Sequence, residues 1–316
     1  MQYSWQFWIA ALLLGLSAPY AVARDIYVDN IGGDDRNDGR APAPLERGAG
    51  PCQTIRRALQ LAQPGDRVVL KKNDEPYRET VTLEGLHHSG NSAGPFMLVG
   101  NGAILDGSMP VDPDSWEFVD GEIFRFQPYR QSFQEIYRDG APLDRRRLAN
   151  RHAALPDLKP LEWCLRDRWV YFRVEPGKLP ETYHLRQATL PVGVTLYHVQ
   201  DVVISDLIVQ GFQLDGINAH NGVLSSRLEG LISRGNARSG VTVTGSSRLT
   251  IEACLLGNNG EAQLRCDGWS KTTVLRTNIL ANTAPAWTVE GGTLMVNGEP
   301  APRESFKDLQ AEEAKP

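Results

Sequence analysis

Apolar residues recur at a nearly fixed interval in the C-terminal half of the chain. Val241, Leu264 and Trp287 lie 23 residues apart, and Ile217 precedes the first of them by 24. The residues two positions further on are also apolar, while those in between are mostly polar. Because side chains alternate between two faces along a strand, each repeat predicts a strand with one buried face. A period of this length indicates stacked units that cannot bury their apolar sides alone.

Asparagines repeat with the same interval. Asn236, Asn259 and Asn282 are 23 residues apart, and we expect them to stack at a bend between strands. Stacked amides can hydrogen-bond to each other, and Asn tolerates the left-handed backbone of a sharp turn. Together with the β-branched, Gly-rich repeats, this ladder predicts that residues 192–291 form the regular coils of a right-handed parallel β-helix, an all-β solenoid. The composition disfavours a helical repeat, and the consensus spacing of a leucine-rich repeat is missing.

The N-terminal part of the chain predicts one helix among short strands. The apolar residues at positions 55, 58, 59 and 62 share one helical face, with Thr54 as N-cap and Pro64-Gly65 as the stop. Strand-like stretches occupy residues 25–28, 68–70, 80–83, 96–99 and 103–105. We expect residues 24–107 to form the first coils, with the helix capping their open apolar end.

The coil pattern is lost between residues 108 and 191. This segment is rich in aromatic residues, and stretches such as 122–126 and 169–174 alternate apolar and polar side chains. We expect a β-rich insertion packed on the side of the solenoid. Residues 292–316 are expected to form a C-terminal cap and a charged tail.

The opening motifs resemble those of a known superfamily. They are Tyr27-Val-Asp29 and the stretches 33–39, 54–58, 64–68 and 77–81. They are similar to the start of secreted right-handed parallel β-helix proteins of the pectate-lyase-like superfamily, closest in style to family-nine polysaccharide lyase-like proteins. The resemblance covers residues 25–107 by motif and 192–291 by coil pattern. It implies the fold more than an activity, because these motifs belong to the end cap.

The first 23 residues predict a secretory signal peptide. An apolar run over residues 9–16 precedes the small-x-small site Ala21-Val-Ala23, although the segment before the run contains no Lys or Arg. An uncleaved anchor is the alternative, but the run is shorter than the roughly 20 residues of a membrane span. We therefore expect a secreted, periplasmic or cell-surface protein, a monomer, with no transmembrane span after the signal is removed.

Composition narrows the classes of partner. The net charge of −5 and the pI near 5.7 argue against nucleic acid as the main partner. Four cysteines without C-x-x-C spacing are too few for a disulfide scaffold. Buried thiols are favoured over a bridge between Cys254 and Cys266.

Candidate chemistry lies on the outward face of the coils. Asp267 and Glu290 occupy one column in adjacent coils, which predicts carboxylates about 5 Å apart. Like charges this close raise one pKa or recruit a cation such as Ca²⁺, unless both point into water. His220 falls in the same column two coils away, while Arg265 points the same way and Lys271 lies beside that face. The basic run 144–147 with Arg151 is expected to be solvated surface.

The resemblance implies β-elimination on an acidic, uronate polysaccharide. Lyases of these families remove the proton α to the uronate carboxylate with a basic Lys or Arg, and calcium or Arg neutralises the developing charge. The corresponding roles here would fall to Lys271 or His220 as base, Arg265 as neutraliser, and Asp267 with Glu290 as cation ligands. No catalytic motif of those lyases matches this chain residue by residue.

Three alternatives stay open at this point. A uronate epimerase of the same fold would carry an Asp-Pro-His-Asp signature, which the stretch 215–221 lacks. A glycoside hydrolase would use two carboxylates, with no motif to favour it. A non-catalytic glycan-binding or cell-surface module would use Trp169, Tyr171 and Trp269 as stacking platforms, although packing within the fold is favoured for these side chains.

Overall fold

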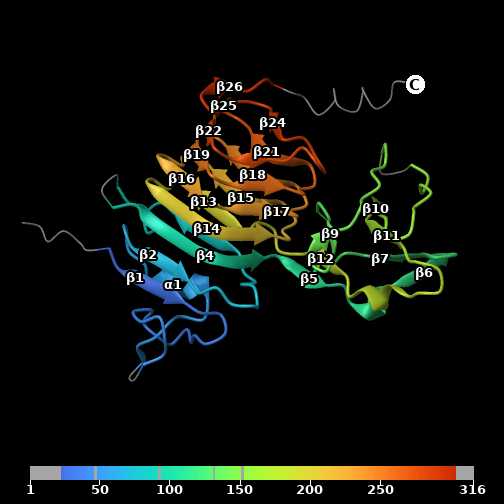
Figure 1. The fold of residues 1–316 in the computed structure, drawn as a ribbon, viewed down its shortest axis with the longest axis horizontal. Coiled ribbons are helices and arrows are strands. Elements are labelled where there is room, and N and C mark those ends of the chain that lie inside the picture. Colours follow the sequence, from blue (N-terminus) through green and yellow to red (C-terminus); the bar gives the residue numbers. More distant parts are fainter. Residues whose placement is uncertain (1–22, 46–47, 92–93, 131, 151–152, 304–316) are drawn as a thin grey trace, which may run out of the picture.

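The computed structural model describes residues 23–45, 48–91, 94–130, 132–150 and 153–303. Most of them form a parallel β-helix, as the repeat predicts (Figure 1). The larger, 12-stranded sheet contains β1 (Asp25–Val28), β2 (Arg67–Leu70), β4 (Phe96–Asp106), β14 (Val202–Gln210), β16 (Ser226–Glu229), β17 (Ile232–Arg234), β19 (Arg248–Glu252), β20 (Leu255–Gly257), β22 (Lys271–Leu275), β23 (Asn278–Ile279), β25 (Thr293–Val296) and β26 (Glu299–Pro300). The second, 6-stranded sheet contains β3 (Val81–Glu84), β13 (Val194–Tyr197), β15 (Asp215–His220), β18 (Ser239–Thr244), β21 (Ala262–Cys266) and β24 (Trp287–Val289).

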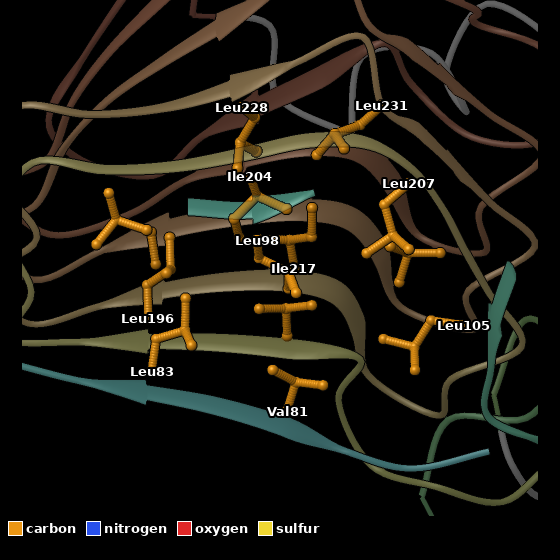
Figure 2. Close-up of a cluster of buried hydrophobic side chains, with 14 of the residues drawn as sticks. Val81, Leu83, Leu98, Leu105, Leu196, Ile204, Leu207, Ile217, Leu228 and Leu231 are labelled. Atoms are coloured by element: carbon orange, nitrogen blue, oxygen red, sulfur yellow. The ribbon is translucent and has the colours of Figure 1, made fainter. Parts of the chain in front are cut away.

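The register of the second sheet is the one that the repeat predicts. Ile217 pairs with Val241, Val241 with Leu264, and Leu264 with Trp287. The first three of these side chains are fully buried. They continue a column that begins at Val81, so each coil adds one apolar layer between the sheets (Figure 2).

The asparagine ladder is confirmed for two of its three members. Asn236 and Asn259 are buried, and Asn236 Nδ2 donates to Asn259 Oδ1 at 3.0 Å. The prediction for Asn282 was wrong: this residue is exposed, and its amide nitrogen donates to Asn258 at 2.6 Å. The last turn is one residue out of step, so the Thr283 hydroxyl donates to the Asn259 carbonyl instead.

Helix α1 (Ile55–Leu61) covers the N-terminal end of the solenoid, where it contacts β1, β2 and β3 (Figure 1). Thr54 is the predicted N-cap and accepts a hydrogen bond from the Arg57 amide at 3.0 Å. Ile55, Ala58 and Leu59 form the buried face that the spacing predicts. At the opposite end, β25 and β26 form an antiparallel pair.

The insertion contains two small antiparallel sheets that project from one side of the solenoid (Figure 1). The outer sheet has the order β10 (Trp163–Arg166), β11 (Trp169–Arg173), β7 (Ile123–Phe126), β6 (Glu117–Asp120). The inner sheet has the order β5 (Ser108–Pro110), β12 (Arg186–Ala188), β8 (Ile136–Arg138), β9 (Ala141–Pro142), and two 3₁₀ helices, η2 (Pro113–Ser115) and η3 (Pro180–Tyr183), flank it. Trp163, Phe126 and Phe172 form a core that belongs to the insertion itself.

All four cysteines are buried free thiols, so the alternative of a Cys254–Cys266 bridge is wrong. Within the described part of the chain, no helix has the length and apolarity needed to cross a membrane. The predicted signal peptide falls almost entirely on residues 1–22, which lie outside the described residues, as do Arg151 and residues 304–316 of the tail.

Candidate functional site

Arg265 lies between the two carboxylates that the coil alignment places in one column. Its Nη2 is 3.0 Å from Asp267 Oδ2 and 3.8 Å from Glu290 Oε2. A guanidinium group therefore already lies beside both carboxylates and balances one of their two charges. A calcium ion takes six to eight oxygen ligands. It does not fit between the two carboxylates in this arrangement, and the described residues contain no group of three or more His, Cys, Asp or Glu that could hold a metal.

The other two predicted residues lie apart from Arg265. His220 is exposed at the end of β15, and its ring stacks on Tyr197 with centroids 6.0 Å apart. Lys271 begins β22 in the other sheet, where it pairs in register with Arg248. The structure therefore brings together Arg265, Asp267 and Glu290, but it places His220 and Lys271 elsewhere.

A cleft of about 620 Å³ lies where the insertion meets the later coils. The insertion supplies one wall and the turns of two coils supply the other. The lining residues are Glu135, Ala141, Pro142, Leu143, Asp144, Arg145, Arg146, Arg147, Glu162, Asn258, Gly260, Asn282 and Thr283. We refer to this space as the junction cleft.

The basic run lines this cleft, and Asp144, Arg146 and Arg147 are exposed as expected for solvated surface, whereas Arg145 is partly buried. The side chains of Arg145 and Arg147 are 20% and 32% exposed, and both reach across to Glu261 on the solenoid. Arg147 Nη1 lies 2.9 Å from Glu261 Oε2, and Arg145 Nη1 lies 3.4 Å from Oε1. A spacing pattern within the run carries no information about a partner more than a hundred residues away.

Glu135 is the buried acid of the cleft. The residue is 5% exposed and precedes β8, and its carbonyl accepts a hydrogen bond from the Ala188 amide at 3.0 Å. Burial raises the pKa of its carboxyl group to about 8, against the opposing effect of Arg145 and Arg147, while Glu261 raises it further. Glu135 is therefore mostly neutral at pH 7.

Arg145 is the partly buried cation next to Glu135. Burial lowers the pKa of its guanidinium group, and the group lies over the Trp163 ring at 5.2 Å from the centroid. Its Nε has no hydrogen-bond partner among the described residues.

Arg146 and Glu162 form a second pair in the same wall. Arg146 Nε lies 3.0 Å from Glu162 Oε2, which also accepts from the Lys159 amide at 2.8 Å. The Arg146 side chain is 49% exposed, so part of its guanidinium group faces solvent. The cleft therefore combines three arginines with carboxyl groups of unequal burial.

The sequence contained one weak signal for Glu135. Phe133, Glu135 and Tyr137 alternate along the chain, so in an extended segment Glu135 would share a face with two aromatic residues. Such a residue is expected to be buried and paired or neutral. Of the three candidate stacking platforms, Tyr171 is buried and Trp169 lies against the Arg125 guanidinium at 4.1 Å, as the favoured packing predicts, whereas Trp269 is 86% exposed and does not pack within the fold.

No protein-family model and no curated protein sequence matches the chain. Among solved structures, one described as a glycoside hydrolase is similar with a TM-score of 0.58 and 10% identity, over 88% of this chain and 74% of that chain. XylC in complex with xylose (TM-score 0.40, 11% identity, 86% of this chain and 69% of that chain) and pectate lyase Pel9A (0.42, 12%, 86% and 58%) are more distant. At these identities the first likeness shows that the chain shares its fold with a protein described as a glycoside hydrolase.

Proposed function

We propose that this chain is a carbohydrate-active enzyme that binds an acidic polysaccharide in the junction cleft and hydrolyses a glycosidic bond there. The observation that carries the proposal is the unequal state of two carboxyl groups, one of which lines the cleft while the other pairs with two of the arginines that line it. Glu135 is buried and mostly neutral at pH 7, whereas Glu261 is held against two guanidinium groups. Acid/base cleavage of a glycoside requires one carboxyl group that is protonated and a second one that is ionised, so the two groups need different environments.

Glu135 and Glu261 would divide the chemistry between them. Glu135 gives its proton to the glycosidic oxygen as the bond from that oxygen to the anomeric carbon breaks. Glu261 accepts a proton from a water molecule whose oxygen bonds to the anomeric carbon. The products are two shorter chains, and one water molecule is consumed. The ion pairs with Arg145 and Arg147 fix the position of the Glu261 carboxylate during this step.

The arginines support an acidic polymer over a neutral one. Arg146 lines the cleft and its side chain is half-exposed. Guanidinium groups bind carboxylates through paired hydrogen bonds, so a uronate carboxylate fits this wall. Export, predicted from residues 1–23, would bring such a protein to extracellular polysaccharide.

β-Elimination on the outward coil face is the second candidate. It is favoured by Arg265, which lies on this face, next to Asp267, as a cation that could neutralise a uronate carboxylate. In this version Lys271 or His220 would act as the base. Dependence on calcium stays a prediction, and a non-catalytic glycan-binding module remains the outcome if no polymer is cleaved.

One assay separates these candidates. The purified protein is incubated with polygalacturonate, alginate, glucuronoxylan and neutral xylan, with and without calcium. New reducing ends and the ultraviolet absorbance of unsaturated products are followed together. Hydrolysis in the junction cleft predicts reducing ends without absorbance, whereas β-elimination produces both. Absence of new reducing ends with every polymer would refute both enzymatic proposals.

Matched variants locate the activity. Glu135→Gln and Glu261→Gln should each lower the hydrolysis rate by about a hundredfold or more, because each removes one proton-transfer group. Glu117→Gln, which changes an exposed glutamate on the outer sheet, should leave the rate unchanged. Loss of activity in Asp267→Asn and Glu290→Gln, with full activity in Glu135→Gln, would instead move the site to the coil face.

A further inference from the structure

The junction cleft is closed at the end that faces the first coils. The Tyr137 hydroxyl of β8 donates to the Gly235 carbonyl, which fixes the inner sheet against the solenoid. On the other side of Glu135, Gln213 Nε2 donates to the Arg130 carbonyl at 3.1 Å, and the Arg238 guanidinium lies over the Phe133 ring at 6.0 Å. These contacts attach the insertion to the two coils that precede the cleft.

The space narrows in the same direction. The cleft of about 620 Å³ shares Ala141, Pro142 and Asn258 with a cavity of only about 100 Å³. That smaller cavity extends back toward Ser108, whose carbonyl accepts a hydrogen bond from Arg186 Nη2 at 2.7 Å. A polymer chain in the junction cleft would therefore meet the base of the insertion.

The opposite end of the cleft is open. Asn282 and Thr283 line it from the turn of the last coils, and both residues are exposed. Beyond the closed end, on the same row of turns, a separate cavity of about 530 Å³ is lined by Thr80, Arg78 and Leu190. The insertion thus lies between these two hollows.

We infer that the protein acts on the ends of polysaccharide chains and not on internal bonds. The inference rests on the proposed function and adds its mode of action. A groove that is open at both ends accepts the middle of a chain, whereas a cleft closed at one end accepts only a terminus. Glu135 belongs to the closed end, because its backbone is hydrogen-bonded to Ala188 of the inner sheet. The bond that it protonates therefore lies close to the chain terminus.

The course of degradation tests this mode directly. End-wise cleavage by the wild-type protein predicts that short products of one size appear from the start, while the remaining polymer shortens slowly. Random internal cleavage predicts an early fall in viscosity and a broad range of product sizes, and would overturn the inference while leaving hydrolysis intact.

Two matched substitutions test the direction of entry. Thr283→Trp fills the open end of the cleft and should lower the rate of polymer cleavage by about tenfold or more. Thr80→Trp adds the same bulk to an exposed threonine beyond the closed end and should leave the rate unchanged. An equal loss in both variants would mean that the chain passes the insertion. Thermal unfolding of each variant checks that both remain folded.

Binding gives an outcome that does not depend on cleavage. Glu135→Gln is titrated with length-fractionated polygalacturonate, and with every other polymer of the panel, in sedimentation experiments. End binding predicts one protein per chain end at every length, whereas internal binding predicts a number that grows with length. If one protein binds per chain end but the wild type cleaves no polymer, the proposed hydrolysis is refuted and the inference of end binding is not. If the number of bound proteins grows with chain length, or if no polymer binds, the inference is overturned.

Discussion

Replacing Glu135 by Gln tests whether the acid of the junction cleft is neutral in the folded protein. The substitution keeps the shape of the side chain and removes its titration. An unfolded chain ionises this carboxyl group with an ordinary pKa near 4.5, whereas burial raises the pKa to about 8 in the folded state. Between these values the folded state binds one proton that the unfolded state does not. The free energy of unfolding of the wild type therefore falls as pH rises through this window.

The magnitude follows from the size of the shift. Each pH unit in the window lowers the free energy of unfolding by about 1.4 kcal/mol. From pH 5 to pH 8 the loss is on the order of 4 kcal/mol, which is a large part of the total stability of a typical domain. The contribution of Glu135 is fully present below the unfolded pKa and is lost as pH rises through the folded pKa. The Gln variant carries no such dependence.

The measurement is the difference in unfolding free energy between variant and wild type, from urea denaturation at several pH values between 5 and 8.5. The difference should move steadily in favour of the variant. Glu117→Gln, an exposed and ion-paired control, should show a constant difference. Infrared spectroscopy of the wild type should also detect the band of a protonated carboxyl group, which disappears as pH rises through about 8. The Glu135→Gln variant should lack this band at every pH. Parallel profiles for the wild type and Glu135→Gln would refute the assignment of a neutral, buried acid.

Four further outcomes follow from the contacts. Cleavage by the wild type should decline as pH rises through about 8, because Glu135 loses the proton that it donates, and a pH–rate profile tests this. Asn236→Ala should cost about 1–3 kcal/mol of stability, because the buried Phe212 amide loses its acceptor and Asn259 Oδ1 loses a donor, while Asn282→Ala at the exposed end of the ladder should cost less than about 1 kcal/mol in the same urea assay. Tyr137→Phe should cost about 1 kcal/mol, since the Gly235 carbonyl keeps a second donor, and a much larger loss would contradict the contact. Titration of the denatured, unreduced protein should find four free thiols.

The coil architecture was predictable from the sequence because it rests on local periodicity. Alternation of faces fixed which residues of each strand point inward, and the register of Ile217, Val241 and Leu264 is the predicted one. The same reasoning placed Arg265, Asp267 and Glu290 together, although it left out that Arg265 would bridge the two carboxylates. The failure at Asn282 arose where one residue interrupts the period, which a fixed spacing cannot anticipate.

The junction cleft could not be predicted in this way, because its parts come from segments without a common period. Arg147 and Glu261 are more than a hundred residues apart, and the sequence places only one of them on a coil. The run of arginines has the composition of an ordinary solvated surface, and its ion pairs with Glu261 and Glu162 distinguish it. The apolar neighbours of Glu135 were visible, but the element that buries it was not.

The repeat also explains why chemistry belongs at the insertion. A regular solenoid stacks equivalent positions about 4.8 Å apart, so neighbouring coils present similar side chains to similar solvent. On such a face carboxyl groups of adjacent coils can share one cation, as Asp267 and Glu290 share Arg265, and neither of the two is fully buried. Acid/base catalysis needs the opposite, a proton donor and a carboxylate with different affinities for the proton. The insertion interrupts the repeat and supplies both environments, because it contains the buried Glu135 and the two arginines that pair with Glu261.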